Sequence, residues 1–403
     1  MNKKQIIAIC LIIYLIIAFG TEILYRGKLY NKSVEYIEKI EQKGFFHYFY
    51  FFWSMIYIYL MLIMALFYTL FFCPINIYFS FLSIELLLVF IMCILKSLYT
   101  NPRPYWDIYV EKQNNRTDTF LPTPTECDGE FGNPSGHALI STLILHIWNL
   151  FINSKYFNSI NGKKQIFIKY ITLIFSLISI IFVTYSRIHR QIHSFNQILF
   201  GTLLGIAVFF LFCYIFEINR ITSNEFFNNL NKFKFIIIPL FIILFIISAL
   251  LGLTQHNERE KQYSIILNKY CQFDKEQIFG RITAFNSTLI FTLIGAYIGL
   301  LFLKHKINKN YPKNEDIFYN WNKGEKYKTL LISIISFFIP GLTLLIIPII
   351  PFKYYIIKFV SAILLYFMYG FLSMGVLFYY SCVMFKKKDI EDEIIKDDEE
   401  ENI

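Results

Sequence analysis

The chain has 403 residues, of which 56% are hydrophobic and only 17% are charged. Soluble globular proteins are about 45–50% apolar and about 25% charged, so this composition argues against a water-soluble enzyme and against a disordered chain. The formal net charge is +9, but no Lys- and Arg-rich block interleaved with aromatic residues forms a nucleic-acid-binding stripe. The 7 cysteines include no CxxC pair, which argues against a zinc site. We therefore expect a multi-pass membrane protein whose partner is the lipid bilayer and not a nucleic acid.

Apolar runs long enough to cross a membrane recur along the chain, and each span needs about 20 mostly apolar residues. We predict ten spans, at approximately 5–24, 50–72, 76–95, 138–153, 167–185, 195–217, 235–253, 284–303, 329–350 and 355–380. The first run follows Lys3 and Lys4 as in a signal peptide, but no small-residue cleavage site comes after it, so we expect an uncleaved anchor. The pattern predicts an all-α polytopic membrane helical bundle.

The loops between the runs predict a topology. An even number of spans places both ends of the chain on one side of the membrane. Lysine-rich stretches share that cytoplasmic side, at 3–4, 163–164, 304–328 and 386–388. Asn-x-Ser/Thr sequons fall on the opposite side, at Asn31, Asn115 and Asn286. Their agreement supports this orientation.

Two cysteines and the last residues add two further expectations. Cys127 and Cys271 both fall in non-cytoplasmic loops, and we hypothesise that they form a disulfide if that side is an oxidising lumen. Residues 385–403 are rich in Asp and Glu and nearly free of aromatic residues, which predicts a solvated acidic cytoplasmic tail.

The first segment with candidate site residues follows the third apolar run and reads Lys96-Ser-Leu-Tyr-Thr-Asn-Pro-Arg-Pro. Lys96 and Arg103 are two helical turns apart, a spacing that can place both cations on one helix face. Pro102 and Pro104 disfavour helix around Arg103, however, and predict a turn at the membrane surface. On its own the segment is more typical of basic side chains that reach toward lipid headgroups.

The second segment, Asn133-Pro-Ser-Gly-His, opens the fourth run. Pro, Ser and Gly directly before an apolar run fit the N-terminal cap of a helix. The free N–H groups and the positive dipole end of such a helix suit an anion, and Gly136 allows the backbone to approach it closely. The segment therefore predicts an anion site at Ser135, Gly136 and His137, and the alternative is a helix start that happens to carry a histidine.

The third segment lies between the fifth and sixth runs and contains Arg187, His189, Arg190 and His193. Contact with headgroups accounts for one arginine but not for this density of cations and imidazoles. In the ten-span topology all three segments emerge on one side, and converging cations predict a phosphate ligand, because Arg offers a planar fork and Lys a point charge. No Asp/Glu cluster with metal-ligand spacing lies in these segments, which argues against a two-metal phosphatase.

Together, the motifs Lys-x6-Arg-Pro, Pro-Ser-Gly-His and Ser-Arg-x5-His, in this order, resemble the type 2 phosphatidic acid phosphatase/haloperoxidase superfamily. The resemblance covers residues 96–197 by motif and about 1–217 with the core helices. It implies a catalytic core of about six helices over 1–217, about four additional transmembrane helices over 218–384 and the acidic tail over 385–403. It also implies a metal-independent phosphoric monoester hydrolase that needs no cofactor.

The resemblance implies a role for each matching residue. His193 is expected to attack phosphorus and form a phosphohistidine, while His137 protonates the leaving alkoxide and then activates water. The phosphoryl oxygens are expected to be bound by Lys96, Arg103, Ser135, Gly136 and Arg187. Gln197 stands where many members of the superfamily carry an Asp that orients the nucleophile, and it is expected to accept the Nδ1–H bond without adding charge. His189 and Arg190 match no motif position and are interpreted as loop residues near the substrate entrance.

The sequence leaves the substrate open. The pattern His-x3-Gln, the run Arg-Pro-Tyr-Trp, the position of Cys127 and about five spans from the nucleophile onward resemble the glucose-6-phosphatase branch, whereas the extra N-terminal span and the divergent C-terminal region do not. Lipid phosphates such as phosphatidate and sugar phosphates such as glucose 6-phosphate both remain candidates. The alternatives to hydrolysis are a phosphotransferase that acts on lipid head groups, and a non-catalytic transporter or scaffold. We expect a multi-pass protein of the endoplasmic reticulum or another endomembrane, with the site on the luminal or extracellular side.

Overall fold

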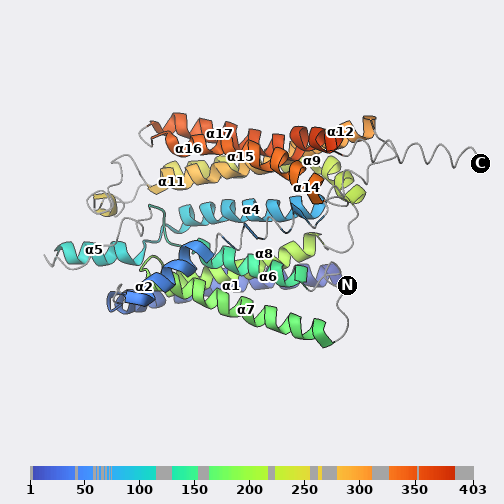
Figure 1. Cartoon of the computed structure of the whole chain (residues 1–403). Helices are drawn as coiled ribbons and strands as arrows, with labels where there is room; N and C mark the ends of the chain where they lie inside the picture. Colours follow the sequence, from blue (N-terminus) through green and yellow to red (C-terminus); the bar gives the residue numbers. More distant parts are fainter. Residues whose placement is uncertain are drawn as a thin grey trace, which may run out of the picture. The chain divides into compact units, whose positions relative to one another are not determined.

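The structure is a computed structural model. It describes residues 3–40, 44–57, 60, 63–64, 68, 70–71, 73, 75–114, 129–152, 163–216, 223–254, 262–265, 279–310, 326–351 and 354–385. All regular secondary structure within these ranges is helical (Figure 1). The expectations for Asn115, for a disulfide between Cys127 and Cys271, and for the acidic tail beyond Phe385 fall outside the described residues.

Eight of the described helices are long and apolar enough to cross a membrane. They are Ile9–Glu38, Ile75–Glu111, Ile166–His189, Phe195–Cys213, Asn231–Gly252, Arg281–Asn310, Lys326–Ile349 and Tyr355–Phe385. The expected run at 50–72 lies partly outside the described residues, and the run at 138–153 forms a helix of 17 residues, Gly136–Ile152, shorter than the usual span. The all-α polytopic bundle is confirmed, whereas the total of ten spans stays a prediction.

The chain divides into two compact units. The first comprises Met1–Ala65, Ile91–Arg220 and Ser248–Ala284, and the second comprises Leu66–Phe90, Ile221–Ile247 and Phe285–Ile403. This grouping differs from the continuous segments 1–217 and 218–384, because α4 (Ile75–Tyr99) and α9 (Ser223–Thr254) each contribute residues to both units.

The first unit contains all three motif segments. Besides the C-terminal part of α4, its helices are α1 (Lys3–Glu38), α2 (Gly44–Phe51), the π-helix η1 (Phe52–Tyr57), α5 (Pro104–Asn114), α6 (Gly136–Ile152), α7 (Lys163–His189) and α8 (Phe195–Phe216). Large apolar side chains remain exposed along α7, among them Ile171, Ile174, Phe175, Ile178 and Ile181. Such a surface fits contact with lipid tails, which are as apolar as these side chains.

The second unit is also helical in its described residues. With parts of α4, α9 and α11 (Phe279–Asn286), it contains η3 (Ser287–Leu289), α12 (Ile290–Asn310), α14 (Lys326–Ser333), η4 (Ile334–Phe338), α15 (Ile339–Leu342), η5 (Thr343–Leu345), α16 (Ile346–Ile349), α17 (Tyr355–Phe371) and η7 (Leu372–Val376). Helix α12 packs closely on α17 and η7, since a Cβ atom at Gly299 would lie 2.8 Å from the carbonyl oxygen of Phe371.

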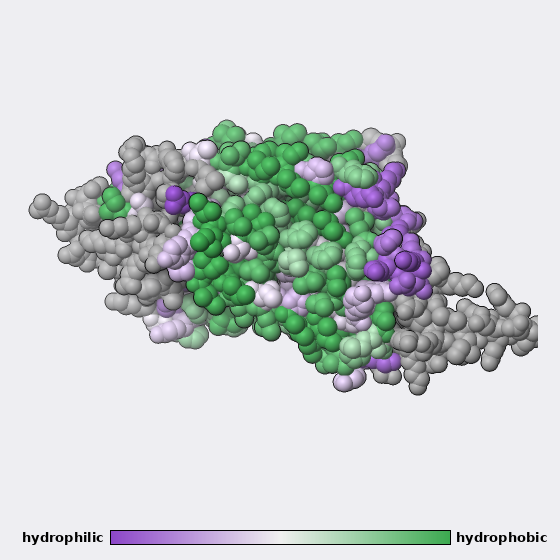
Figure 2. All heavy atoms as spheres, turned by 90° about the horizontal axis from the view of Figure 1, so that it is seen from above, coloured by the Kyte–Doolittle hydropathy of each residue, from purple (hydrophilic) through white to green (hydrophobic). Residues whose placement is uncertain are grey.

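Figure 2 draws all heavy atoms of the chain and shows that hydrophobic side chains dominate the face it displays.

Helices α6 and α8 pack backbone to backbone near the motif residues. A Cβ atom at Gly201 would lie 2.6 Å from the carbonyl oxygen of Ser135, and one at Gly205 would lie 2.7 Å from that of Leu139. Two glycines four residues apart therefore let α8 approach the first turns of α6, as small residues do between membrane helices. This close approach brings the second and third motif segments together.

Helix α1 is longer than the predicted anchor and packs along α8. The rings of Phe19 and Phe200 meet edge to face with centroids 5.2 Å apart. The hydroxyl of Tyr14 donates to the carbonyl oxygen of Leu203 at 3.0 Å. The N-terminal helix is therefore part of the first unit's core and not an isolated anchor.

Candidate active site

The first motif segment forms a turn between two helices. Lys96 lies in the last turn of α4, which ends at Tyr99, and Arg103 directly precedes Pro104, the first residue of α5. Proline suits the first position of a helix because its missing N–H would have no partner there, and Pro102 disfavours helix in the residue before it. The turn expected around Arg103 is present. Both cations are buried, with exposures of 4% for Lys96 and 0% for Arg103.

The second motif segment leads directly into α6, which begins at Gly136, two residues before the start of the predicted run. The backbone N–H of Ser135 donates to the carbonyl oxygen of Gln197 at 3.0 Å, which ties this segment to α8. The Oγ atom of Ser135 and the Nε2 atom of His137 are buried without a hydrogen-bond partner among the described residues. Leaving a buried polar atom unpaired costs about 1–3 kcal/mol, so both atoms favour a polar ligand at this point.

The third motif segment corrects one expectation. Helix α7 continues to His189, because neither Gly nor Pro interrupts it and cations suit the C-terminal end of a helix dipole. The segment is therefore partly helical, whereas the sequence analysis placed it in an inter-helix loop. His189 is 6% and Arg190 is 1% exposed, so both side chains are buried, and their expected place near the substrate entrance stays a prediction.

A short turn between α7 and α8 carries His193. The backbone N–H groups of Ile192 and His193 both donate to the carbonyl oxygen of Arg187, at 3.1 and 3.3 Å. Gln191 adopts a positive φ of 61° in this turn, and its side-chain amide donates to the carbonyl oxygen of Ile37 at 3.2 Å. The turn therefore ties His193 to Arg187, the third cation that is predicted to bind phosphate.

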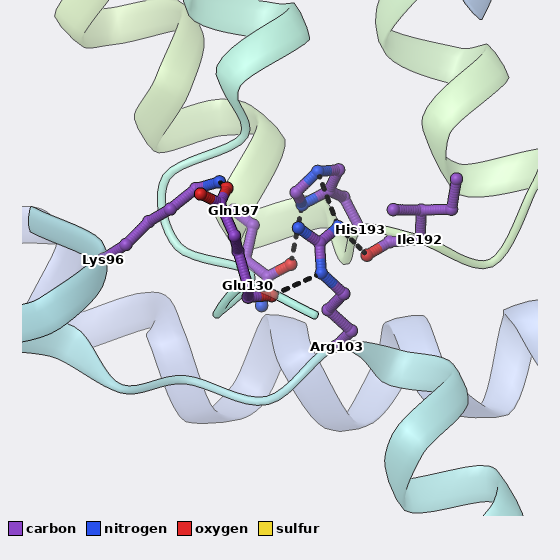
Figure 3. Close-up of polar contacts among 6 residues, drawn as sticks. All are labelled: Lys96, Arg103, Glu130, Ile192, His193 and Gln197. Atoms are coloured by element: carbon purple, nitrogen blue, oxygen red, sulfur yellow. Dashed lines mark hydrogen bonds and ion pairs between the residues drawn. The ribbon is translucent and has the colours of Figure 1, made fainter. Parts of the chain in front are cut away.

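The imidazole of His193 lies between Gln197 and Arg103 (Figure 3). Its Nδ1 atom is 3.2 Å from Oε1 of Gln197, and its Nε2 atom is 3.3 Å from Nη1 of Arg103. An amide oxygen accepts and a guanidinium donates, so Nδ1 carries the proton and Nε2 presents a lone pair. The amide of Gln197 is itself fixed by a 2.8 Å hydrogen bond to the carbonyl oxygen of Pro102.

Burial and the positive charges of the motif segments lower the pKa of both histidines. His137 and His193 lie outside the eight candidate spans, and burial, as the main cause, lowers the pKa of each well below its ordinary value. The charges that lower it further belong to Arg187, Lys96, Arg190 and Arg103 for His137, and to Arg103, Arg187 and Lys96 for His193. His137 also lowers the pKa of His193. Because such effects weaken with distance, these cations lie near the two histidines.

Ser54 is a site residue that the sequence analysis missed. It lies in η1, and its Oγ atom accepts hydrogen bonds from Nη1 of Arg187 at 2.5 Å and from Nη1 of Arg190 at 3.1 Å. The guanidinium of Arg190 also lies over the ring of Phe51, 5.1 Å from its centroid. A serine inside an apolar run far from the motifs carries no local signal, so only the folded chain reveals this contact.

Glu130 is the second residue that the sequence analysis missed. Its Oε2 atom pairs with Nζ of Lys96, and its backbone carbonyl oxygen accepts a 2.6 Å hydrogen bond from Nε of Arg103 (Figure 3). Nη1 of Arg103 also lies 3.5 Å from the carbonyl oxygen of Ile192. The available signal was an acidic residue shortly before the Pro-Ser-Gly-His motif, but its partner Lys96 lies 34 residues away.

Helix α1 contacts all three motif segments or the helices next to them. Three of the hydrogen bonds of its side chains hold these parts of the site: Asn133 Nδ2 to Glu22 Oε1 at 3.0 Å, Phe195 N to Ser33 Oγ at 2.8 Å, and Tyr30 Oη to Asp107 Oδ2 at 2.6 Å. The helix expected to be an anchor therefore also holds the site's segments relative to one another.

The donor set of this site suits an anion. Within the described ranges, no group of three or more His, Cys, Asp or Glu side chains is placed to hold a metal ion. Guanidinium and ammonium groups instead gather around the two imidazoles, and these groups bind phosphate or carboxylate oxygens.

A comparison with protein families finds a match that covers this site. Residues 77–221 match the family model described as the PAP2 superfamily, and this range includes every site residue predicted from the sequence. The match supports the superfamily that the motifs resemble, and with it a phosphatase in general. The comparisons with curated proteins and with solved structures find no match.

Proposed function

We propose that the protein is an integral-membrane phosphatase that hydrolyses phosphomonoesters without a metal, through a phosphohistidine on His193. The observation that carries this proposal is the environment of the His193 ring. Its Nδ1 proton is directed to Gln197, and its Nε2 lone pair faces the guanidinium of Arg103. A neutral imidazole held in one tautomer beside a phosphate-binding cation is the arrangement that a phosphorus-attacking nucleophile needs.

The proposed reaction proceeds in two displacements. The Nε2 lone pair of His193 forms a bond to phosphorus while the bond from phosphorus to the ester oxygen breaks, and His137 gives a proton to the leaving oxygen. Water then attacks the phosphohistidine, His137 takes one of its protons, and the phosphorus–nitrogen bond breaks to release phosphate. Lys96, Arg103 and Arg187 bind the phosphoryl oxygens and stabilise the charge of each transition state.

The substrate is either a lipid phosphate such as phosphatidate or a sugar phosphate such as glucose 6-phosphate. The neutral Gln197 beside the nucleophile supports the glucose-6-phosphatase-like branch, because the motif resemblance associates His-x3-Gln with it. The membrane-spanning helices equally suit a substrate that arrives from the bilayer. We place the site on the luminal or extracellular side, in the endoplasmic reticulum or another endomembrane.

The test is phosphate release by the full-length protein, purified and reconstituted in lipid nanodiscs, from phosphatidate, sphingoid-base phosphate, polyprenyl phosphate and glucose 6-phosphate. We expect one of these to be hydrolysed in the presence of EDTA and the hydrolysis to be inhibited by orthovanadate. His193→Ala should abolish both turnover and the trapping of labelled phosphoenzyme.

The matched control is His146→Ala. His146 lies on α6 like His137, but its ring bonds to the carbonyl oxygen of Thr142 at 2.6 Å and packs against Phe209. This variant should keep wild-type turnover. Hydrolysis that survives in His193→Ala, or that disappears with EDTA, would contradict the proposed mechanism. Transfer of phosphate to an alcohol in place of water would instead favour the phosphotransferase alternative.

A further inference from the structure

Glu130 introduces a carboxylate into the group of cations proposed to bind phosphate. The residue is 8% exposed, and its partner Lys96 is 4% exposed. Both charges lose hydration at such depth, and each is tolerated because the other compensates it. The ammonium group of Lys96 therefore has an anionic partner within the protein itself.

The same residue also holds Arg103. Nε of Arg103 donates to the backbone oxygen of Glu130 at 2.6 Å, while Nη1 lies 3.3 Å from Nε2 of His193 (Figure 3). In this arrangement the guanidinium covers the lone pair that is proposed to attack phosphorus. A phosphoryl group must therefore replace His193 as the partner of Arg103, and replace or approach the Glu130 carboxylate as the partner of Lys96.

A carboxylate and a phosphoryl group on one ammonium group repel each other. Both are anions, and the screening that water provides at a surface is weak at a buried position. Glu130 therefore lowers the affinity of the site for substrate phosphate and for product phosphate alike. Weaker binding of product phosphate speeds its release, because a phosphate dianion surrounded by several buried cations would otherwise dissociate slowly.

We propose that Glu130 is an internal competitor for the phosphate site, which neutralises Lys96 in the empty enzyme and promotes the release of product phosphate. The proposal rests on the proposed phosphatase function. A competitor and a residue that merely positions Lys96 predict opposite changes in phosphate affinity. Removal of a positioning residue weakens phosphate binding, whereas removal of a competitor strengthens it.

The experiment compares inorganic phosphate binding to wild-type protein and to Glu130→Gln, both full-length and in nanodiscs. Ligand-induced thermal stabilisation reports the dissociation constant without requiring activity. Since glutamine keeps the shape of the side chain but removes the charge, we expect the Kd for phosphate to fall about tenfold, which corresponds to about 1.4 kcal/mol. KM and the inhibition constant of phosphate should fall with it, and kcat should fall as release becomes limiting.

Two controls sharpen the result. Glu111→Gln removes an exposed carboxylate on α5 and should leave phosphate affinity unchanged. In a Lys96→Ala background, Glu130→Gln should tighten phosphate binding much less, because the competition acts through the Lys96 ammonium group.

The outcomes separate this inference from the function on which it rests. If wild-type protein neither binds phosphate nor hydrolyses any phosphomonoester, the proposed function fails. If wild-type protein does both but Glu130→Gln binds phosphate equally or more weakly, the competitor role is overturned. Glu130→Ala serves as the second variant if Gln is not tolerated. Failure of both variants to fold would also overturn the proposal, since the ion pair would then be a structural one that substrate does not open.

Discussion

Replacement of Gln197 by glutamate tests the electrostatics of the proposed nucleophile. Gln197 is fully buried, and its Oε1 atom accepts the Nδ1 proton of His193 at 3.2 Å without bringing a charge. A carboxylate at the same position would favour the imidazolium, and an opposite charge at such a distance shifts a pKa by about 1–3. We therefore expect Gln197→Glu to raise the pKa of His193 by about that amount.

The pH profile of kcat/KM measures this change, because its acid limb reports the groups of the free enzyme that must be deprotonated. In the wild-type protein, burial and the neighbouring cations hold the pKa of His193 well below its ordinary value. The neutral nucleophile therefore persists below pH about 6.5, and activity falls only as the pH drops through the lowered pKa. In Gln197→Glu the acid limb should move to higher pH.

The control for this prediction is Gln197→Leu, which removes the acceptor and adds no charge. Loss of one buried hydrogen bond costs about 1–3 kcal/mol, so kcat/KM should fall between about fivefold and a hundredfold with no upward movement of the acid limb. If the acid limb of folded Gln197→Glu coincides with that of the wild-type protein, the conclusion that Gln197 governs the charge state of His193 is refuted.

Three further substitutions test how the site is held together. Glu22→Leu leaves the buried amide of Asn133 without its acceptor, so it should lower kcat and reduce the free energy of unfolding by about 1–3 kcal/mol. Glu22→Gln keeps an acceptor and should restore much of both. Gly201→Ala places a Cβ atom 2.6 Å from the Ser135 carbonyl oxygen and should lower unfolding stability in detergent by about 1–3 kcal/mol. Ser54→Ala removes the hydroxyl shared by two arginines and should raise KM about tenfold with a smaller effect on kcat; an unchanged KM would separate Ser54 from phosphate binding.

Much of the fold could be predicted because its signals are local. Uninterrupted apolar runs indicate the helices, and the prolines at 102 and 104 indicate the turn that holds Arg103. The Pro-Ser-Gly run likewise marks the first residue of α6. The length of α1 and the division of α4 between two units were not predictable, because both depend on which helices pack together and not on local composition.

Some residues of the candidate site could be predicted from local sequence patterns, whereas others depend on contacts between distant parts of the chain. The histidines and cations stand in short motifs, and the sequence analysis named them from chemistry and spacing. Ser54 and Glu130 bond to motif residues that lie 133 and 34 positions away, in segments without any pattern of their own. The burial of Arg190 was not predictable either, because a distant serine hydroxyl and an aromatic face stabilise this guanidinium in the interior.

The balance of charge in the site connects binding to catalysis. Burial and the neighbouring cations lower the pKa of His193 and favour its neutral form, as the proposed nucleophile requires, but they also lower the pKa of His137, which must carry a proton in its proposed role as an acid. A phosphomonoester dianion changes this balance because its negative charge offsets the cations and raises the pKa of His137 in the complex. Under the proposed mechanism we therefore expect His137 to acquire its proton together with the substrate, and His193 to remain unprotonated until phosphate is in place. A ligand with less negative charge would raise the pKa of His137 less, so the proposed mechanism predicts a preference for dianionic phosphomonoesters at the chemical step and not only at binding.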